Sequence, residues 1–153
     1  MEDPRPVLVL GRGVRLERHD LAAIARELAV PVTSSAPEIF ADIDAERMRT
    51  VIRNLLENAQ KYATTATIDV TTAGDTVVLR VSDDGPGIPE DDLTSLFEPF
   101  FRVNRSRSKT PAGYGLGLSI CKRIVEAHGG TISAANNPDR GATFTISLPK
   151  PSR

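Results

Sequence analysis

The sequence predicts a two-layer α/β (α+β) sandwich, in which a mixed, largely antiparallel sheet is covered by helices on one face. Two segments carry apolar residues at the spacing of one helix face, namely 44–59 and 116–128. Two pairs of segments alternate polar and apolar residues as half-buried strands do: 67–72 with 76–82, and 131–135 with 143–148. Together these segments form one α/β domain.

The helix that begins at Asp44 is the best-defined element. Its apolar residues keep the 3.6-residue period: Met48, Val51, Ile52, Leu55, Leu56 and Ala59. The first strand pair is joined by Ala73-Gly74-Asp75, which is typical of a hairpin turn. The later helix is entered from glycines and is ended by Gly129-Gly130.

The N-terminal part contains shorter elements. Residues 7–10 and 14–17 alternate around Gly11-Arg12-Gly13, which predicts either a hairpin or a linker, so we assign residues 1–18 to a preceding region. Asp20 is expected to cap a helix that runs to about Ala29, before Pro31. Residues 32–39 are expected to be extended. The main domain is therefore expected to span residues 19–150, with a tail at 151–153.

Two further segments lie between the strand pairs. We expect a short helix around residues 93–97. Residues 102–115 are polar and basic and lack periodicity, which predicts a mobile loop.

Composition restricts the function classes. The 19 basic and 20 acidic residues nearly cancel, so no global positive field draws the chain toward nucleic acid or an anionic membrane. No stretch approaches the roughly 20 apolar residues that span a bilayer, and no secretion signal is evident. The single cysteine, Cys121, sits in an apolar helical pattern, which indicates a packed side chain in a reducing, cytosolic setting.

Three polar residues share one helix face, because Asn54, Asn58 and Lys61 are spaced by four and three positions. An asparagine oxygen can ligate a hard cation such as Mg²⁺, and a lysine can meet attached phosphates. The alternative is an ordinary solvated helix edge.

Two glycine-containing segments add to this pattern. Asp83-Asp84-Gly85-Pro86-Gly87 follows a predicted strand, where glycines let the backbone approach a planar ligand and a carboxylate can accept a bond from an exocyclic amine. A simple turn is the alternative. Gly113-Tyr114-Gly115-Leu116-Gly117-Leu118 precedes a helix whose N-terminal amides suit a polyphosphate. Neither the Walker pattern nor the dinucleotide pattern fits this segment.

In this order, the motifs resemble the boxes of bacterial sensor histidine kinases: Asn54-Leu55-Leu56-Glu57-Asn58-Ala59-Gln60-Lys61-Tyr62, then 83–89, then 113–118. Residues 96–103 resemble that family's phenylalanine segment, and Gly129-Gly130 with 141–144 resembles its closing strands. The resemblance covers about residues 20–149. It implies the Bergerat fold of the GHKL superfamily and an ATP-binding catalytic domain.

The resemblance also implies ATP and Mg²⁺ as cofactors and a role for each matching residue. Asn58 resembles the magnesium ligand and Asp83 the residue that reads the adenine amino group. Catalytic roles would fall to Asn54, Lys61, which meets phosphate, and Arg102, which reaches the γ-phosphate. Residues 103–115 resemble a lid that orders over ATP. The nucleotide-binding set would be Asn58, Lys61, Tyr62, Asp83, Gly85, Gly87, Ile88, Arg102, Gly113, Tyr114, Gly115, Leu116, Gly117 and Leu118.

Some positions leave alternatives or depart from the family pattern. Tyr62, which resembles a residue that packs on the base, and Phe100 could each be core aromatics. Ala142 stands where many relatives of the wider superfamily have a hydroxyl, so backbone or water would have to replace that bond. Asn54 stands where the gyrase, Hsp90 and MutL branches carry a glutamate that activates water. Asparagine cannot act as a general base, which favours phosphotransfer over hydrolysis.

The phosphoacceptor of this family is a histidine, and the chain has only His19 and His128. His19 is expected to be a surface or capping residue, because the sequence around it lacks the acceptor pattern. His128 is expected to end a helix, where a partly positive imidazole suits the dipole. The acceptor would then lie on a separate dimerisation domain, and the isolated domain would be a monomer.

The resemblance implies two partners, the dimerisation and phosphoacceptor domain of the same kinase and a response regulator. It also implies a cytoplasmic domain of a full-length protein anchored in the bacterial inner membrane. Two other functions remain open: a serine kinase of the anti-sigma-factor type, against which residues 97–102 argue, and a nucleotide-sensing module that transfers no phosphate.

Overall fold

The order of elements matches the predicted alternation of helices and strand pairs. The computed structural model describes residues 13–63, 65–98 and 117–151. Its elements are β1 (Glu17–Asp20), α1 (Leu21–Arg26), β2 (Val32–Ser34), β3 (Phe40–Ile43), α2 (Ala45–Tyr62), β4 (Ala66–Ala73), β5 (Thr76–Asp83), the 3₁₀ turn η1 (Glu90–Asp92), α3 (Leu118–Ala127), β6 (Thr131–Asn136) and β7 (Ala142–Pro149).

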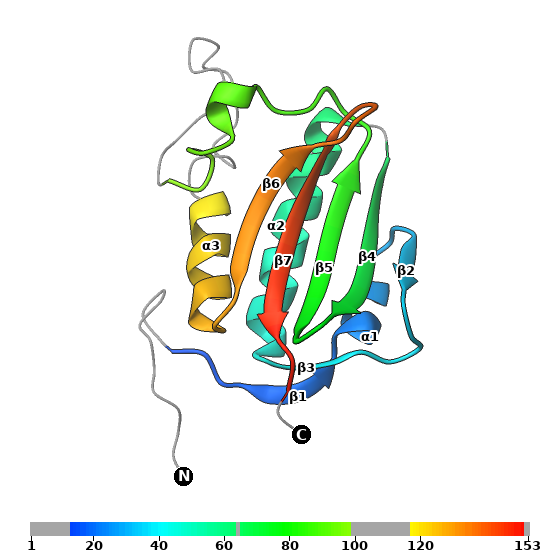
Figure 1. Cartoon of the computed structure of the whole chain (residues 1–153), viewed down its shortest axis with the longest axis vertical. Helices are drawn as coiled ribbons and strands as arrows, with labels where there is room; N and C mark the ends of the chain where they lie inside the picture. The colour runs from blue at the N-terminus through cyan, green and yellow to red at the C-terminus, as the bar shows by residue number, and fades with distance from the viewer. Residues whose placement is uncertain (1–12, 64, 99–116, 152–153) are drawn as a thin grey trace.

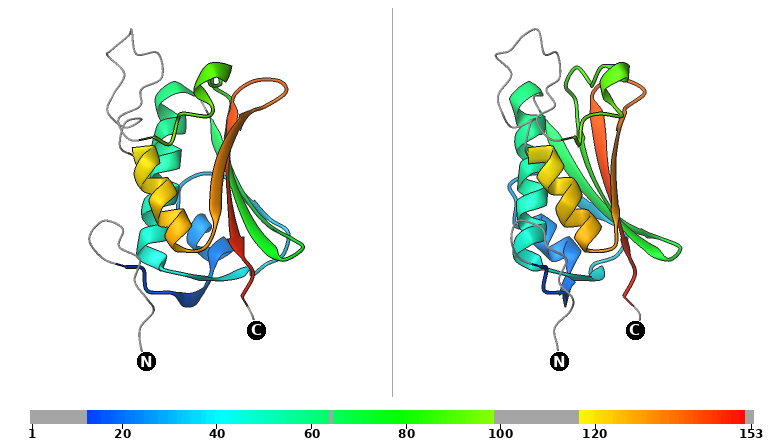
Figure 2. Two further views of the ribbon diagram at one scale, coloured as in Figure 1. Left: turned by 60° about the vertical axis from the view of Figure 1, so that its left-hand side comes forward. Right: turned by 90° about the vertical axis from the view of Figure 1, so that its left-hand side faces the viewer.

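The main sheet has five strands in the order β2-β4-β5-β7-β6. The pairs β4-β5, β5-β7 and β6-β7 are antiparallel, whereas the short β2 pairs with β4 in parallel. The helices lie on one face of this sheet (Figures 1 and 2). This arrangement confirms the predicted two-layer fold with a mixed, largely antiparallel sheet.

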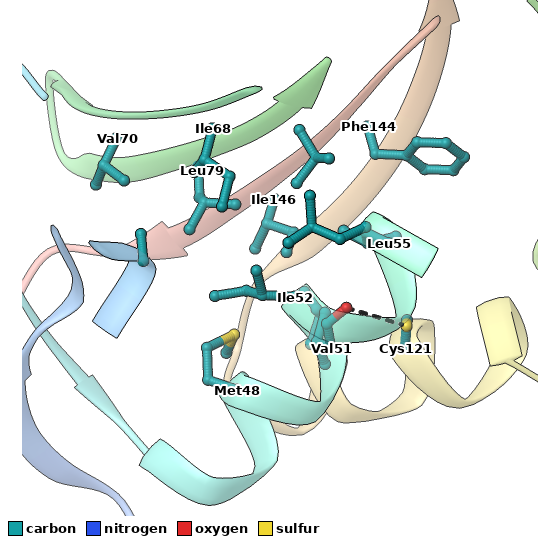
Figure 3. Packing of buried hydrophobic residues seen from close by; sticks show 14 of the residues in the cluster. Met48, Val51, Ile52, Leu55, Ile68, Val70, Leu79, Cys121, Phe144 and Ile146 are labelled. Atoms are coloured by element: carbon teal, nitrogen blue, oxygen red, sulfur yellow. Dashed lines mark hydrogen bonds between the residues drawn. The ribbon is translucent and has the colours of Figure 1, made fainter. Parts of the chain in front are cut away.

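The core lies between the helices and the covered face of the sheet. The register places Ile68 opposite Val81 and Leu79 opposite Ile146, so that alternate residues of adjacent strands share this face. Figure 3 shows residues of α2 pointing toward these strands. Met48, Ile52 and Leu55, from the predicted apolar face of α2, are fully buried there.

Aspartate side chains start both N-terminal helices, as predicted. Asp20 Oδ1 accepts bonds from the Ala22 and Ala23 amides at 3.1 and 3.3 Å, and Asp44 Oδ1 accepts from the Arg47 amide at 3.2 Å. Helix α1 ends at Arg26, before the expected Ala29. The chain must turn there to enter β2, whose parallel pairing with β4 begins with the bond from the Ile68 amide to the Pro31 carbonyl.

Two other segments differ from expectation. The predicted extended segment 32–39 contains only the short strand β2, and β3 starts after it and pairs with β1 in a separate two-stranded sheet. The helix expected at 93–97 is absent. The chain forms η1, followed by two turns in which the Ser95 and Glu98 amides donate to carbonyl groups three residues earlier. These turns allow Leu96 to pack into the core and Phe97 to pack edge-on against Phe144.

The expected strand at 7–10 and the expected lid at 103–115 lie outside the described residues. None of the helices in the described ranges combines the length and the apolar character that crossing a membrane requires.

Candidate nucleotide site

Two predicted site segments, the asparagine motif of α2 and the loop after β5, meet at one end of the sheet, at the top of Figure 1. This end holds the C-terminal end of α2, the end of β5 and the connection between β6 and β7. Asp84 joins the first two: its Oδ1 accepts from the Thr65 amide at 2.9 Å, and its own amide donates to the Thr65 carbonyl at 3.3 Å. The loop after β5 is thereby held beside the end of α2.

The Asp83 carboxylate is held by backbone groups on two sides. Its Oδ1 accepts bonds from the amides of Gly85 at 2.9 Å and Ala142 at 3.2 Å. Oδ2 has no hydrogen-bond partner within residues 13–63, 65–98 and 117–151. The Ala142 side chain has no hydroxyl, so its contact with the Asp83 carboxylate is made by the backbone amide.

Gly141 explains how β7 can come this close to Asp83. Its φ is +88°, and a Cβ atom there would lie 1.9 Å from the Asp83 carbonyl oxygen. Because this neighbour is backbone and cannot move aside, only glycine fits at position 141. The residue is required for the carboxylate to receive the Ala142 amide.

Asn58 lies on the buried side of α2, near its C-terminal end. It is only 6% exposed, although it is polar. No side chain or backbone group in the described part of the chain forms a hydrogen bond with its side-chain amide. Buried amides normally have partners, so among the described residues this amide is a candidate ligand group.

Asn54, one turn earlier, faces helix α3. Its Nδ2 donates a weak bond to Cys121 Sγ at 3.8 Å. The Cys121 thiol is fully buried and donates to the Val51 carbonyl at 3.8 Å, as Figure 3 shows. Burial raises the pKa of the Cys121 thiol to about 12. This confirms that Cys121 is a packed side chain, because its reactive thiolate is disfavoured.

The remaining predicted residues fall into three groups. Ile88 and Leu118 have side chains buried in the hydrophobic core. Gly117 precedes α3, and a Cβ built there meets no atom within 4 Å among the described residues. Gly85 and Gly87 lie in the loop that carries Asp83.

Several predicted residues cannot be placed. The side chains of Lys61 and Tyr62, the last two residues of α2, lie outside what the structure describes, and so do Phe100, Arg102, Gly113, Tyr114, Gly115 and Leu116.

Both histidines have defined surroundings. His19 lies in β1 with a partly exposed side chain, and its Nε2 is 3.7 Å from Glu17 Oε1. His128 follows α3, as expected, but the expectation of a partly positive imidazole was wrong. Its Nε2 accepts from the Asp44 amide at 3.0 Å, its Nδ1 lies 2.8 Å from the Ile124 carbonyl oxygen, and burial lowers its pKa. An imidazole that accepts at one nitrogen and donates at the other is neutral.

Sequence reasoning placed residues 136–141 between the last two strands but missed the role of this connection in the site. Asn137 Nδ2 donates to the Asp83 carbonyl at 3.2 Å, and Arg140 Nε donates to the Asp84 carbonyl at 2.7 Å. Asn136 bonds to Ile88 in two places. The segment 136–141 looks like an ordinary polar turn in the sequence, and no local signal shows that its side chains bond to the loop after β5.

Comparison with known proteins agrees with this geometry. The family model described as histidine kinase-, DNA gyrase B-, and HSP90-like ATPase matches residues 43–152. The chain is 42% identical over 128 residues to the sensor protein KdpD of Escherichia coli, covering 80% of this chain and 14% of that protein. It is 37% identical over 147 residues to the signal transduction histidine-protein kinase BaeS of Escherichia coli, covering 94% and 30%. The chain therefore spans less than a third of each of these two relatives.

Solved structures agree as well. The nucleotide-free catalytic domain of histidine kinase ThkA superposes with a TM-score of 0.76 at 25% identity, covering 90% of this chain and 98% of that one. The histidine kinase domain of the Escherichia coli osmosensor EnvZ gives 0.69 at 26%, covering 90% of each. The chain therefore belongs to the histidine kinase-, DNA gyrase B- and HSP90-like ATPase family, as an ATP-binding catalytic domain of the sensor histidine kinase type.

Proposed function

We propose that this domain binds ATP with Mg²⁺ and donates the γ-phosphoryl group to a histidine on a separate dimerisation domain, for relay to a response regulator. The observation that carries the proposal is the buried amide of Asn58, which has no partner among the described residues. It lies on the family's asparagine motif near the C-terminal end of α2, and the oriented carboxylate of Asp83 lies at the end of β5.

Asp83 supports recognition of adenine. Two backbone amides orient the carboxylate through Oδ1, so Oδ2 can accept a hydrogen bond from the exocyclic amino group of the base. Guanine presents a carbonyl oxygen at that ring position, and two acceptors facing each other repel. The site should therefore prefer ATP to GTP.

Asn58 supports the metal assignment, because an amide oxygen is the hard ligand that Mg²⁺ accepts. When bound, Mg²⁺ would neutralise charge on the phosphate oxygens. Lys61 is spaced three residues further along α2 and would meet the same phosphates. The amides at the start of α3 point along the helix axis and would add partial positive charge there.

The acceptor histidine would come from outside this domain. Both ring nitrogens of His128 are already hydrogen-bonded and its ring is buried, so it has no free nitrogen to attack phosphorus. His19 lies in β1. In the transfer, a nitrogen lone pair of the acceptor forms the N–P bond while the bond to the ADP oxygen breaks. Asn54 cannot deprotonate water, which favours this transfer over hydrolysis.

The experiment mixes the domain with Mg²⁺, γ-labelled ATP and candidate dimerisation segments of sensor kinases. We expect label on the segment that is acid-labile and base-stable, as phosphohistidine is. Asp83→Asn should reduce the labelling, whereas Asp75→Asn, in the turn at the opposite end of β5, should not. ATP binding without transfer to any segment would favour a nucleotide sensor, and acid-stable label would favour a serine kinase. We also propose that the complete protein is membrane-anchored, with this domain in the cytoplasm.

A further inference from the structure

Asn136, the last residue of β6, bonds to the backbone of Ile88 in the loop after β5. Its Oδ1 accepts from the Ile88 amide at 2.7 Å, and its Nδ2 donates to the Ile88 carbonyl at 2.8 Å. A carboxamide has the donor and the acceptor of a peptide group, so this side chain pairs with Ile88 as a neighbouring strand would. One side chain thereby fixes both polar backbone groups of Ile88.

Gly87 makes this contact possible. Its φ is +87°, and a Cβ atom at this position would lie 2.8 Å from Asn136 Oδ1. The glycine therefore provides both the backbone conformation and the room that the Asn136 side chain occupies. The loop that starts at Asp83 is bound at its far end by this pairing.

Asn136 and its neighbour Asn137 differ in the hydrogen-bond partners of their side chains. Asn137 also bonds within its own turn, to the Arg140 carbonyl and to the Thr143 hydroxyl, so it shapes the connection itself. The hydrogen bonds of the Asn136 side chain within the described residues all go to Ile88. Asn136 is exposed, so removing its amide leaves no buried hole.

We propose that Asn136 is a positioning residue for nucleotide binding, which holds the loop from Asp83 to Ile88 in the conformation that receives the base. The inference rests on the proposed function, in which Asp83 contacts adenine. A loop fixed before the ligand arrives loses less conformational entropy on binding, which raises the affinity. Asn136 touches neither the base nor the phosphates and acts through the backbone of the loop.

The test compares Asn136→Ala with Asp139→Ala, an exposed residue of the same connection. Affinities for ATP and GTP are measured by displacement of a fluorescent ADP analogue with Mg²⁺ present. We expect Asn136→Ala to bind ATP about tenfold more weakly, the equivalent of one or two hydrogen bonds, and to lose part of the ATP over GTP preference. A smaller folded fraction would weaken both nucleotides equally, so the preference separates positioning from stability.

A second variant, Asn136→Asp, keeps the size of the side chain and the acceptor for the Ile88 amide but loses the donor to the Ile88 carbonyl. It should also bind ATP more weakly than wild type, and in Asn136→Ala the Ile88 amide should exchange with solvent faster by NMR. Any one of three results would overturn the inference. The first is an ATP affinity of Asn136→Ala within twofold of that of Asp139→Ala, and the second is wild-type ATP affinity in Asn136→Asp. The third is an unchanged rate of solvent exchange at the Ile88 amide in Asn136→Ala. Failure of the wild type to bind ATP would instead reject the proposed function.

Discussion

Replacing His128 with Leu should destabilise the domain and remove a pH dependence from its stability. His128 Nε2 accepts from the amide of Asp44, whose carboxylate caps α2, so this ring ties the end of α3 to the start of α2. The variant leaves the Asp44 amide without its acceptor. At pH 7.5 we expect a loss of about 1–3 kcal/mol in the free energy of unfolding, the cost of an unsatisfied, partly buried donor.

The sign of the pH effect follows from the lowered pKa of His128. Burial is the main cause, and the Ile124 carbonyl and the Asp44 carboxylate oppose it. The unfolded chain, in which the pKa is near 6.5, binds the proton more readily than the folded one. The stabilisation is therefore fully present above that pH and is lost as the pH falls through it. Between pH 7.5 and 5.5 one such group accounts for at most about 1.4 kcal/mol.

Urea unfolding of both proteins at pH 7.5 and 5.5 measures the effect. The gap between wild type and His128→Leu should shrink at pH 5.5, because only the wild type loses this contribution. His19→Leu is the control for loss of an imidazole, since His19 lies in β1 with a partly exposed side chain, and it should lower the free energy of unfolding at pH 7.5 less than His128→Leu does. A gap that stays constant or widens at pH 5.5 would refute the assignment of a neutral, hydrogen-bonded His128.

Other predictions concern the candidate site. Asn58→Ala should weaken Mg²⁺-dependent ATP binding by roughly tenfold, the equivalent of one lost ligand bond. Gln60→Ala, which changes an exposed residue of the same helix, should not weaken it. Equal ATP affinities of the two variants by calorimetry would remove Asn58 from the site. Asp83→Asn should lower the ratio of ATP to GTP affinity, and an unchanged ratio would argue against contact with the base. Cys121 should react with a thiol reagent at pH 8 only as the domain unfolds, because its pKa is about 12 in the folded state; rapid labelling of the native protein would contradict its burial.

Local patterns were enough to predict most of the secondary structure. The apolar period of α2 and its cap at Asp44 depend on residues within a few positions of each other, and so does the hairpin turn at Gly74 between β4 and β5. The motifs around Asn58 and Asp83 were also readable, because the spacing of their residue types is local. Helix and strand periodicities arise from backbone geometry, which the sequence records directly.

Other features depend on contacts between distant segments. No local pattern indicated that β2 would pair in parallel with β4 or that β1 and β3 would form a second sheet. Leu96 and Phe97 enter the core, and their packing replaced the expected helix with turns.

The candidate site shows the same division. The sequence marked Asp83 and Asn58, but the orientation of the Asp83 carboxylate comes from the Ala142 amide, 59 residues away. The Asn136 bonds to Ile88 span 48 residues, and the neutral state of His128 depends on the Asp44 amide 84 residues earlier. A hydrogen bond forms where the folded backbone brings a donor and an acceptor together. The sequence alone therefore marked the candidate residues for nucleotide binding, because their motifs are local, and the tertiary structure decided which groups hold them in place.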